Sequence, residues 1–191
     1  MPLTELKKLI ELYKKHNDDT PIGLLDTKDR CCAIQELIST CPEELYAFIF
    51  FNENGESELF DALADERTSR YISNQIQTTK LFIITNDTKK VKCLKFIEKY
   101  NDNGSDKLEI TPIPKQLAIE LTNETFDSEY FLASPNHLIF IGRYFYNNDE
   151  ENVEKLAEVS SFLNFFDKSF VNTLQDFFNS IKNRIISGEF R

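Results

Sequence analysis

The chain has 191 residues, a formal net charge of −10 and a hydrophobic content of 41%. A chain of this length predicts a single domain with its own core, and its hydrophobicity excludes a disordered protein. The negative charge repels phosphate backbones and anionic lipid surfaces, so we expect no direct binding to nucleic acid. No run approaches the roughly 18 apolar residues of a membrane span, so we expect no membrane insertion.

The cysteines and histidines of the sequence are too few and too scattered to predict a metal site. No two cysteines have the C-x-x-C spacing of many zinc sites, and the two histidines lie far apart. We therefore expect no metal and no cofactor, and we expect the thiols to be buried and structural. The residues concerned are Cys31, Cys32, Cys41, Cys93, His16 and His137.

The N-terminal segment is predicted to be an amphipathic helix, because apolar residues recur at helical spacing over residues 3–16. It is charged and lacks the apolar centre of a secretory signal, which predicts a cytoplasmic location. Export by a route without such a signal stays open. Residues 16–23 are predicted to be a polar turn. We therefore divide the chain into an N-terminal helical appendage, residues 1–25, and a single α/β domain, residues 26–191.

Two short apolar runs, at residues 45–51 and 81–85, are typical of strands that are covered on both faces, and residues 107–111 are predicted to form a third strand. Residues 57–77 have the composition of a helix, and Asn86 or Asp87 is placed to begin another helix after the second run. Strands that alternate with helices favour parallel pairing with right-handed crossovers. The predicted fold is thus α/β, with a mixed, mainly parallel sheet of about five to seven strands flanked by helices.

The C-terminal third changes pattern. Residues 130–134 and 137–146 are predicted to form an antiparallel hairpin around a Pro-Asn turn, and the acidic segment 147–160 is predicted to be partly helical. A long helix closes the chain, and its apolar stripe is wider than one face needs. A helix with such a wide stripe must be covered on two sides. The N-terminal helix, or another subunit or partner, is expected to provide that cover. This candidate interface comprises Phe170, Val171, Leu174, Phe177, Phe178, Ile181 and Ile185.

The order of elements from about residue 28 to 186 resembles one half of a phospholipase D-like domain. In that superfamily a strand carries H-x-K, a turn supplies an Asp, and a second strand leads into a G-S-x-N-like segment. Here the segment from Ile141 to Arg143 lies where the Gly-Ser would be, and residues 160–181 match the closing stretch and helix. The resemblance implies this fold, and it implies pairing, since single halves of the family commonly pair to make one site.

The residues at the H-x-K position differ from those of the active family. The resemblance places Asp127 near the histidine, Glu129 near the lysine and Ser134 near the aspartate. Two carboxylates repel a phosphate and cannot replace an imidazole nucleophile with a cationic neighbour. His137 lies in the wrong place, with no lysine two residues on. The candidate groove, made of these four residues and Arg143, is therefore predicted to lack the family's catalytic chemistry.

The leading functional prediction is a non-catalytic protein-interaction module that binds a protein partner or forms a homodimer. Two alternatives stay open. The acidic surface favours an inhibitor or immunity protein that binds a basic enzyme or mimics nucleic acid. The other alternative is a hydrolase with an unconventional site, in which His137 acts as a base with Asp127 or Glu129 as its partner.

Overall fold

The computed structural model describes residues 3–75, 79–102, 107–123, 128–133, 135–145 and 157–189. Asp127 and Ser134, which were predicted to line the groove, lie outside the described residues. The same holds for most of the acidic segment that was predicted to be partly helical. Its last residues, from Ala157 on, are described and form a strand.

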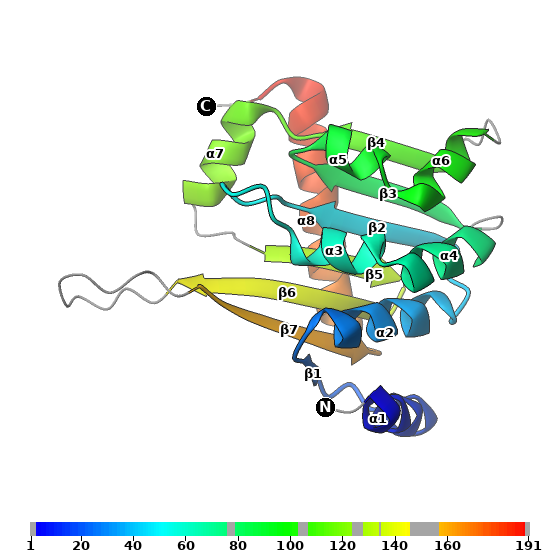
Figure 1. The fold of residues 1–191 in the computed structure, drawn as a ribbon. Coiled ribbons are helices and arrows are strands. Elements are labelled where there is room, and N and C mark those ends of the chain that lie inside the picture. The colour runs from blue at the N-terminus through cyan, green and yellow to red at the C-terminus, as the bar shows by residue number, and fades with distance from the viewer. Residues whose placement is uncertain are drawn as a thin grey trace.

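The core of the molecule is one seven-stranded mixed sheet with the order β1-β7-β6-β5-β2-β3-β4 (Figure 1). Only β2 with β3 and β3 with β4 pair in parallel, whereas β5, β6, β7 and β1 are antiparallel to their neighbours. The prediction of a mainly parallel sheet was therefore wrong, although the predicted hairpin is confirmed. The strands are β1 (Ile22–Leu24), β2 (Glu44–Ile49), β3 (Lys80–Thr85), β4 (Leu108–Pro112), β5 (Ser128–Ala133), β6 (His137–Phe145) and β7 (Ala157–Phe165).

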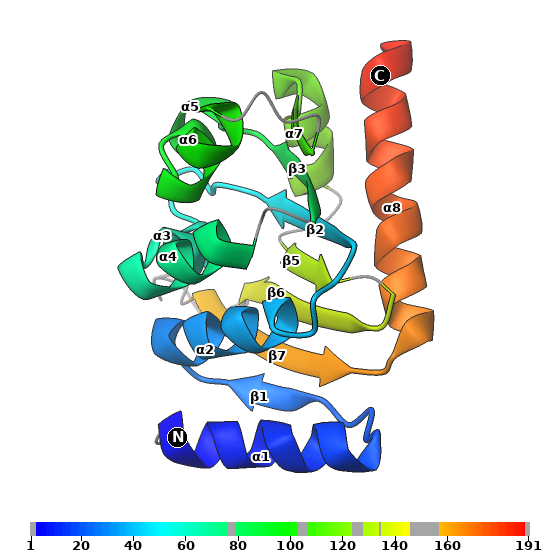
Figure 2. The same ribbon diagram turned by 90° about the vertical axis from the view of Figure 1, so that its right-hand side faces the viewer.

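One face of the sheet is covered by the helix between β1 and β2 and by the helices that connect the parallel strands (Figure 2). They are α2 (Thr27–Ile38), α3 (Glu58–Ala64), α4 (Glu66–Gln75), α5 (Thr88–Lys92) and α6 (Lys95–Asp102). The single helix predicted over 57–77 is two helices, because Asp65 leaves the helical conformation at ψ 135°. The Asp65 carboxylate accepts from the backbone N–H groups of Arg67 and Thr68 at 3.0 Å each, so it begins the second helix.

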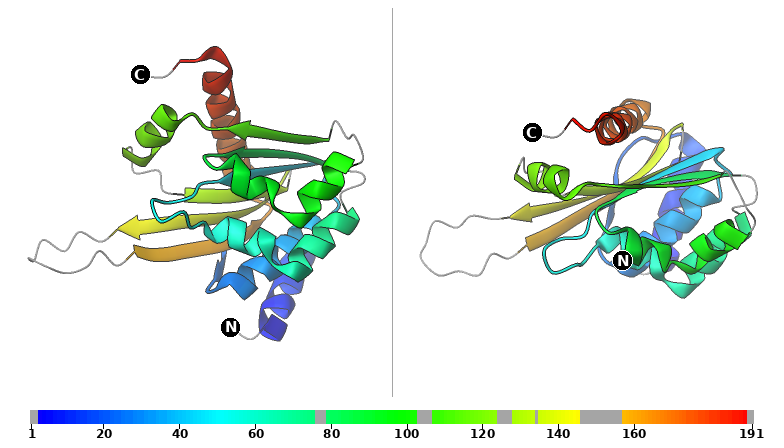
Figure 3. Two further views of the ribbon diagram at one scale, coloured as in Figure 1. Left: turned by 45° about the horizontal axis from the view of Figure 1, so that its top comes forward. Right: turned by 90° about the horizontal axis from the view of Figure 1, so that it is seen from above.

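The other face carries α7 (Lys115–Asn123) and α8 (Lys168–Ser187), as the view from above shows (Figure 3). The predicted stripe of α8 packs on this face of the sheet and forms a second core cluster. Val171, Leu174, Phe178 and Ile181 are buried there, while the other three stripe residues are half-buried. The sheet of the same chain therefore covers most of the stripe that we expected the N-terminal helix or a second subunit to cover.

The N-terminal segment forms α1 (Leu3–His16), with the predicted bounds, followed by the edge strand β1. The strand was not predicted, because its three residues include a glycine and are too few to show a period. Leu6 and Ile10 are 0% exposed and belong to the core cluster that α2 and the sheet share. Residues 1–25 thus supply part of the main core. Among the described helices, none has the length and apolarity needed to cross a membrane.

Candidate functional site

The carboxylate of Glu129, predicted to lie in the groove, is buried at the first turn of α3. Glu129 is 1% exposed and faces the α2–α6 side of the sheet. Its oxygens accept from the hydroxyl of Ser57 and from the backbone N–H groups of Phe50, Glu58 and Leu59, at 3.2, 3.0 and 3.3 Å for the three N–H groups. A carboxylate held by so many donors is occupied as an acceptor and has no room for a phosphoryl group.

The local sequence explains why α3 begins where Glu129 lies. Ser57 is the N-cap residue, and its Oγ accepts from the backbone N–H of Phe60 at 2.9 Å. The N–H groups of the first helical turn have no partner within the helix, so they need an outside acceptor. Glu129 supplies that acceptor across 70 residues of chain. Its negative charge also suits the positive end of a helix.

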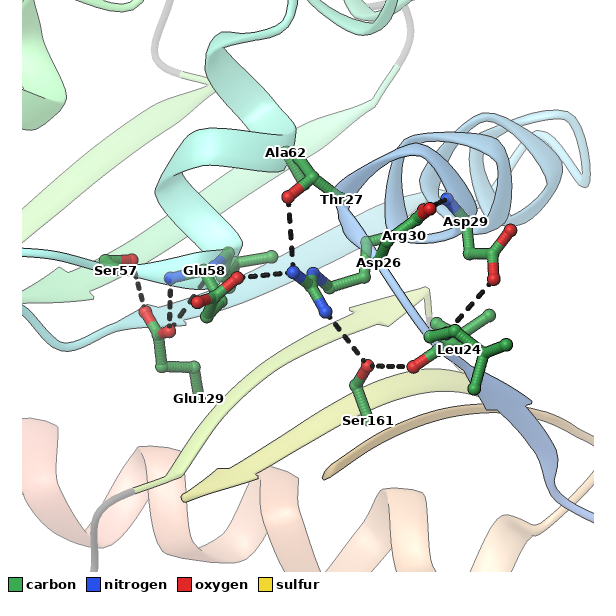
Figure 4. A network of polar contacts seen from close by, with 12 residues as sticks. Leu24, Asp26, Thr27, Asp29, Arg30, Ser57, Glu58, Ala62, Glu129 and Ser161 are labelled. Carbon is green, nitrogen blue, oxygen red and sulfur yellow. Dashed lines mark hydrogen bonds and ion pairs between the residues drawn. The ribbon is translucent and has the colours of Figure 1, made fainter. Parts of the chain in front are cut away.

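An ion pair lies beside this cluster and is mostly buried (Figure 4). Arg30 of α2 is 5% exposed, and its Nη2 bonds to the carboxylate of Glu58 and, at 3.2 Å, to the hydroxyl of Thr27. Its Nη1 donates to the Ser161 hydroxyl at 3.3 Å, and that hydroxyl donates to the carbonyl of Leu24 at 2.9 Å. The guanidinium therefore joins α2, α3, β7 and β1, which is a structural role.

His137 lies at the opposite end of the hairpin from Glu129. The register pairs His137 with Ala133 and Glu129 with Ile141, so four residues of β6 separate the two positions. At about 3.3 Å per residue this separation is roughly 13 Å. A general base and its orienting carboxylate need hydrogen-bond contact, which this register does not provide.

The imidazole of His137 is packed among aromatic rings. It meets Phe165 edge-on at 5.1 Å and Phe166 edge-on at 5.4 Å between ring centroids. Burial, followed by the positive charge of Lys14, lowers the pKa of His137 from 6.5 to about 4. The ring is therefore neutral at neutral pH and fits the apolar contacts around it.

The remaining groove residue, Arg143, has its backbone on β6 opposite Val159. This position lies beyond the last pair of β6 with β5, which is Gly142 with Ser128. In the described part of the chain, the structure thus does not bring the predicted groove residues together. The same described residues contain no group of three or more His, Cys, Asp or Glu side chains that could hold a metal ion.

The four thiols divide into two classes, which gives a direct test. Cys31 and Cys32 are buried on α2, and burial raises the pKa of both thiols. Cys41 and Cys93 are exposed, so the prediction of buried thiols was wrong for these two. Because the thiolate is the reactive form, we expect the exposed pair to react rapidly with a disulfide reagent and the buried pair only after unfolding. Stopped-flow thiol titration measures this. Single Cys41→Ser and Cys93→Ser variants should each remove one fast equivalent, and four equally fast thiols would contradict the fold.

Arg30, Ser57 and Glu58 were not among the predicted site residues. With Glu129 they belong to the polar network of Figure 4. The one available signal was Ser57, a good N-cap residue directly before a helical run. An open depression of about 510 Å³ lies elsewhere, on the outer side of α8, and Arg184 in its wall is already paired with Glu120 at 2.6 Å. No protein-family model matches the sequence, and no curated protein matches it at a significant level.

Proposed function

We propose that the chain is a non-catalytic protein-interaction module on a degenerate phospholipase D-like scaffold. The observation that carries the proposal is the state of Glu129. The resemblance assigns this position to the lysine that steadies a phosphate, and here a buried carboxylate bonded to the start of α3 occupies it. The order of β5, β6, β7 and α8 is also the order of elements that the resemblance implies.

The hydrolase alternative receives no support from the described residues. Its base, His137, and one of its two candidate partners, Glu129, lie at opposite ends of the hairpin, and Glu129 is already bonded to α3. The other candidate partner, Asp127, lies outside the described residues. The functions that remain favoured are those in which the surface of the chain binds a partner. That surface carries a net charge of −10 for the whole chain.

We place the interaction surface on the outer side of α7 and α8, with a second copy of the chain as the first partner. Ile186 of α8 is 73% exposed and Ile119 of α7 is 52% exposed. Phe177 and Ile185 of α8 are half-buried. The ion pair between Arg184 and Glu120 holds the two helices together at 2.6 Å, so they present one rigid layer.

Sedimentation velocity at low and high salt separates the two partner classes. Two copies of an acidic chain repel each other, and salt screens that repulsion, so a homodimer should strengthen with salt. A complex with a basic enzyme should weaken under the same change, because salt screens its attraction. A chain that stays monomeric at both salt concentrations would contradict the homodimer, and salt-weakened binding to basic proteins would favour the inhibitor alternative.

A charged substitution on α8 tests where the partner binds. We expect Ile186→Asp to weaken self-association at least tenfold, because it places a charge in the centre of an apolar contact, which costs more than about 1.4 kcal/mol. Leu25→Asp is the matched control, since Leu25 is also 73% exposed but lies beside β1. Equal association constants for wild type and Ile186→Asp would exclude this surface.

A further inference from the structure

A lysine adds a polar contact to the C-terminal end of α1, beside the packing of Leu6 and Ile10 in the core. The Lys14 ammonium bonds to the Glu36 carboxylate of α2 at 2.8 Å and to the carbonyl of the same residue at 3.3 Å. It also lies over the ring of Phe165 on β7, 5.0 Å from its centroid. Lys14 is therefore one of the residues through which α1 contacts both the neighbouring helix and the sheet.

His137 and Lys14 both contact the ring of Phe165. The Lys14 charge acts on the imidazole of His137. The Nδ1 atom of His137 is buried and has no hydrogen-bond partner among the described residues. A neutral ring fits this environment, whereas an imidazolium would add a second cation near Lys14; burial and the Lys14 charge outweigh a hydrogen bond with the Asn136 backbone, which favours the charged ring.

The charges of the packed elements cannot compensate an imidazolium. From α1 the positive charge of Lys14 acts on the ring, and the Glu36 carboxylate of α2 is paired with Lys14. From the β7–α8 junction it faces Phe165 and Phe166, and the adjacent Asp167 turns its carboxylate to α8, where it accepts from the Phe170 N–H at 2.9 Å. The simplest relief of the added charge is withdrawal of Lys14.

The backbone at the β7–α8 junction, where the His137 ring packs on Phe166, is also strained. Phe166 has φ +74°, a left-handed conformation that is unfavourable for a non-glycine residue. It is held there by its contact with the His137 ring and by a bond from its N–H to the carbonyl of Asn136 at 2.8 Å. Loss of the neutral ring contact therefore removes one of the supports of a conformation that is costly by itself.

We propose that His137 and Lys14 form an acid-sensitive latch, in which protonation of His137 releases α1 from the sheet. Release exposes Leu6 and Ile10, which are 0% exposed when α1 is docked, together with the core surface that they cover. This inference stands on the packing around His137 and does not depend on the proposed function.

The sign of the pH effect follows from linkage. The docked state lowers the pKa of His137 to about 4, and the released state returns it toward 6.5. Between these values the released state binds more protons, so docking is complete above pH 6.5 and weakens as the pH falls toward 4. With allowance for screening at this partly exposed ring, we expect the release equilibrium to rise about tenfold between about pH 7.5 and about pH 5.

Hydrogen exchange of the full chain tests the latch. Protection of the α1 amides, corrected for intrinsic rates, should fall about tenfold in the wild type between about pH 7.5 and about pH 5, while α8 changes less. His137→Phe keeps an aromatic ring and cannot titrate, so it should abolish the pH dependence. His16→Gln removes the other histidine of the chain and should behave as the wild type. Unchanged α1 protection in the wild type, or an equal loss in His137→Phe, would overturn the proposal.

A second measurement covers the case in which His137→Phe does not fold. The imidazole of His137 in the wild type should titrate near pH 4 by NMR, and Lys14→Met should raise that value because the like charge is gone. The same Lys14→Met chain should show less pH dependence in α1. A titration of His137 near 6.5 in the wild type, or no change in Lys14→Met, would contradict the latch.

Discussion

Glu129→Ala is expected to lower the free energy of unfolding by about 4 kcal/mol, the largest effect of any single substitution considered. The change removes the acceptor of the Ser57 hydroxyl and of the N–H groups of Phe50, Glu58 and Leu59. Buried donors left without an acceptor each cost about 1–3 kcal/mol, and part of that cost is recovered if water enters the gap. Urea unfolding followed by circular dichroism measures the difference.

Glu129→Gln separates the charge from the shape. The amide keeps one oxygen acceptor but directs an NH₂ group toward backbone donors, so we expect a loss of about 2–3 kcal/mol. Glu53→Gln is the matched control, because Glu53 is exposed in the turn after β2 and should change stability by less than about 0.5 kcal/mol. If Glu129→Gln is as stable as the wild type, the carboxylate does not hold α3, and a functional role for Glu129 returns.

Arg30→Met is expected to destabilise the chain by about 3 kcal/mol. Methionine fills much of the space of the arginine stem but leaves Glu58, Thr27 and Ser161 without their shared donor. Breaking a buried ion pair by removal of one partner costs about 3–5 kcal/mol, and the 31% exposure of the Glu58 side chain places this pair at the lower end.

A double-mutant cycle isolates the pair itself. Glu58→Gln alone should cost about 1 kcal/mol, and the double variant should cost less than the sum of the two single variants. Arg30→Lys should not restore stability, because one ammonium cannot bond to Glu58 and Ser161 together. Full rescue by lysine, or single-variant costs that add without coupling, would contradict the geometry of Figure 4.

The elements that could be predicted are those with a local period. Residues 3–16 carry a helical stripe, and α1 has those bounds. The apolar runs at 45–51 and 81–85 became β2 and β3 within two residues at each end. The direction of pairing could not be predicted, because it depends on where a strand meets a distant one. Strand β5 lies antiparallel to β2, although about 80 residues separate them in the chain.

The residues of the candidate site could be named from the sequence, but the contacts around them could not be predicted. Glu129 was placed just before the predicted strand 130–134, and the structure includes it in β5. The partner that explains it, the first turn of α3, lies 70 residues earlier and has no signature that points to Glu129. The predicted proximity of His137 to Glu129 was wrong for a different reason. His137 lies next to the turn of the hairpin, whereas Glu129 pairs with Ile141, four residue pairs away from that end.

The central claim is that the buried carboxylate of Glu129 leaves this hairpin without a phosphoryl-transfer site. Mass spectrometry after incubation with an activated phosphodiester tests it most directly, because a covalent histidine intermediate would add the mass of the transferred group. We expect the intact mass to stay unchanged and no hydrolysis above the rate in buffer. A phosphoryl adduct on His137, or turnover that disappears in His137→Ala, would contradict the account.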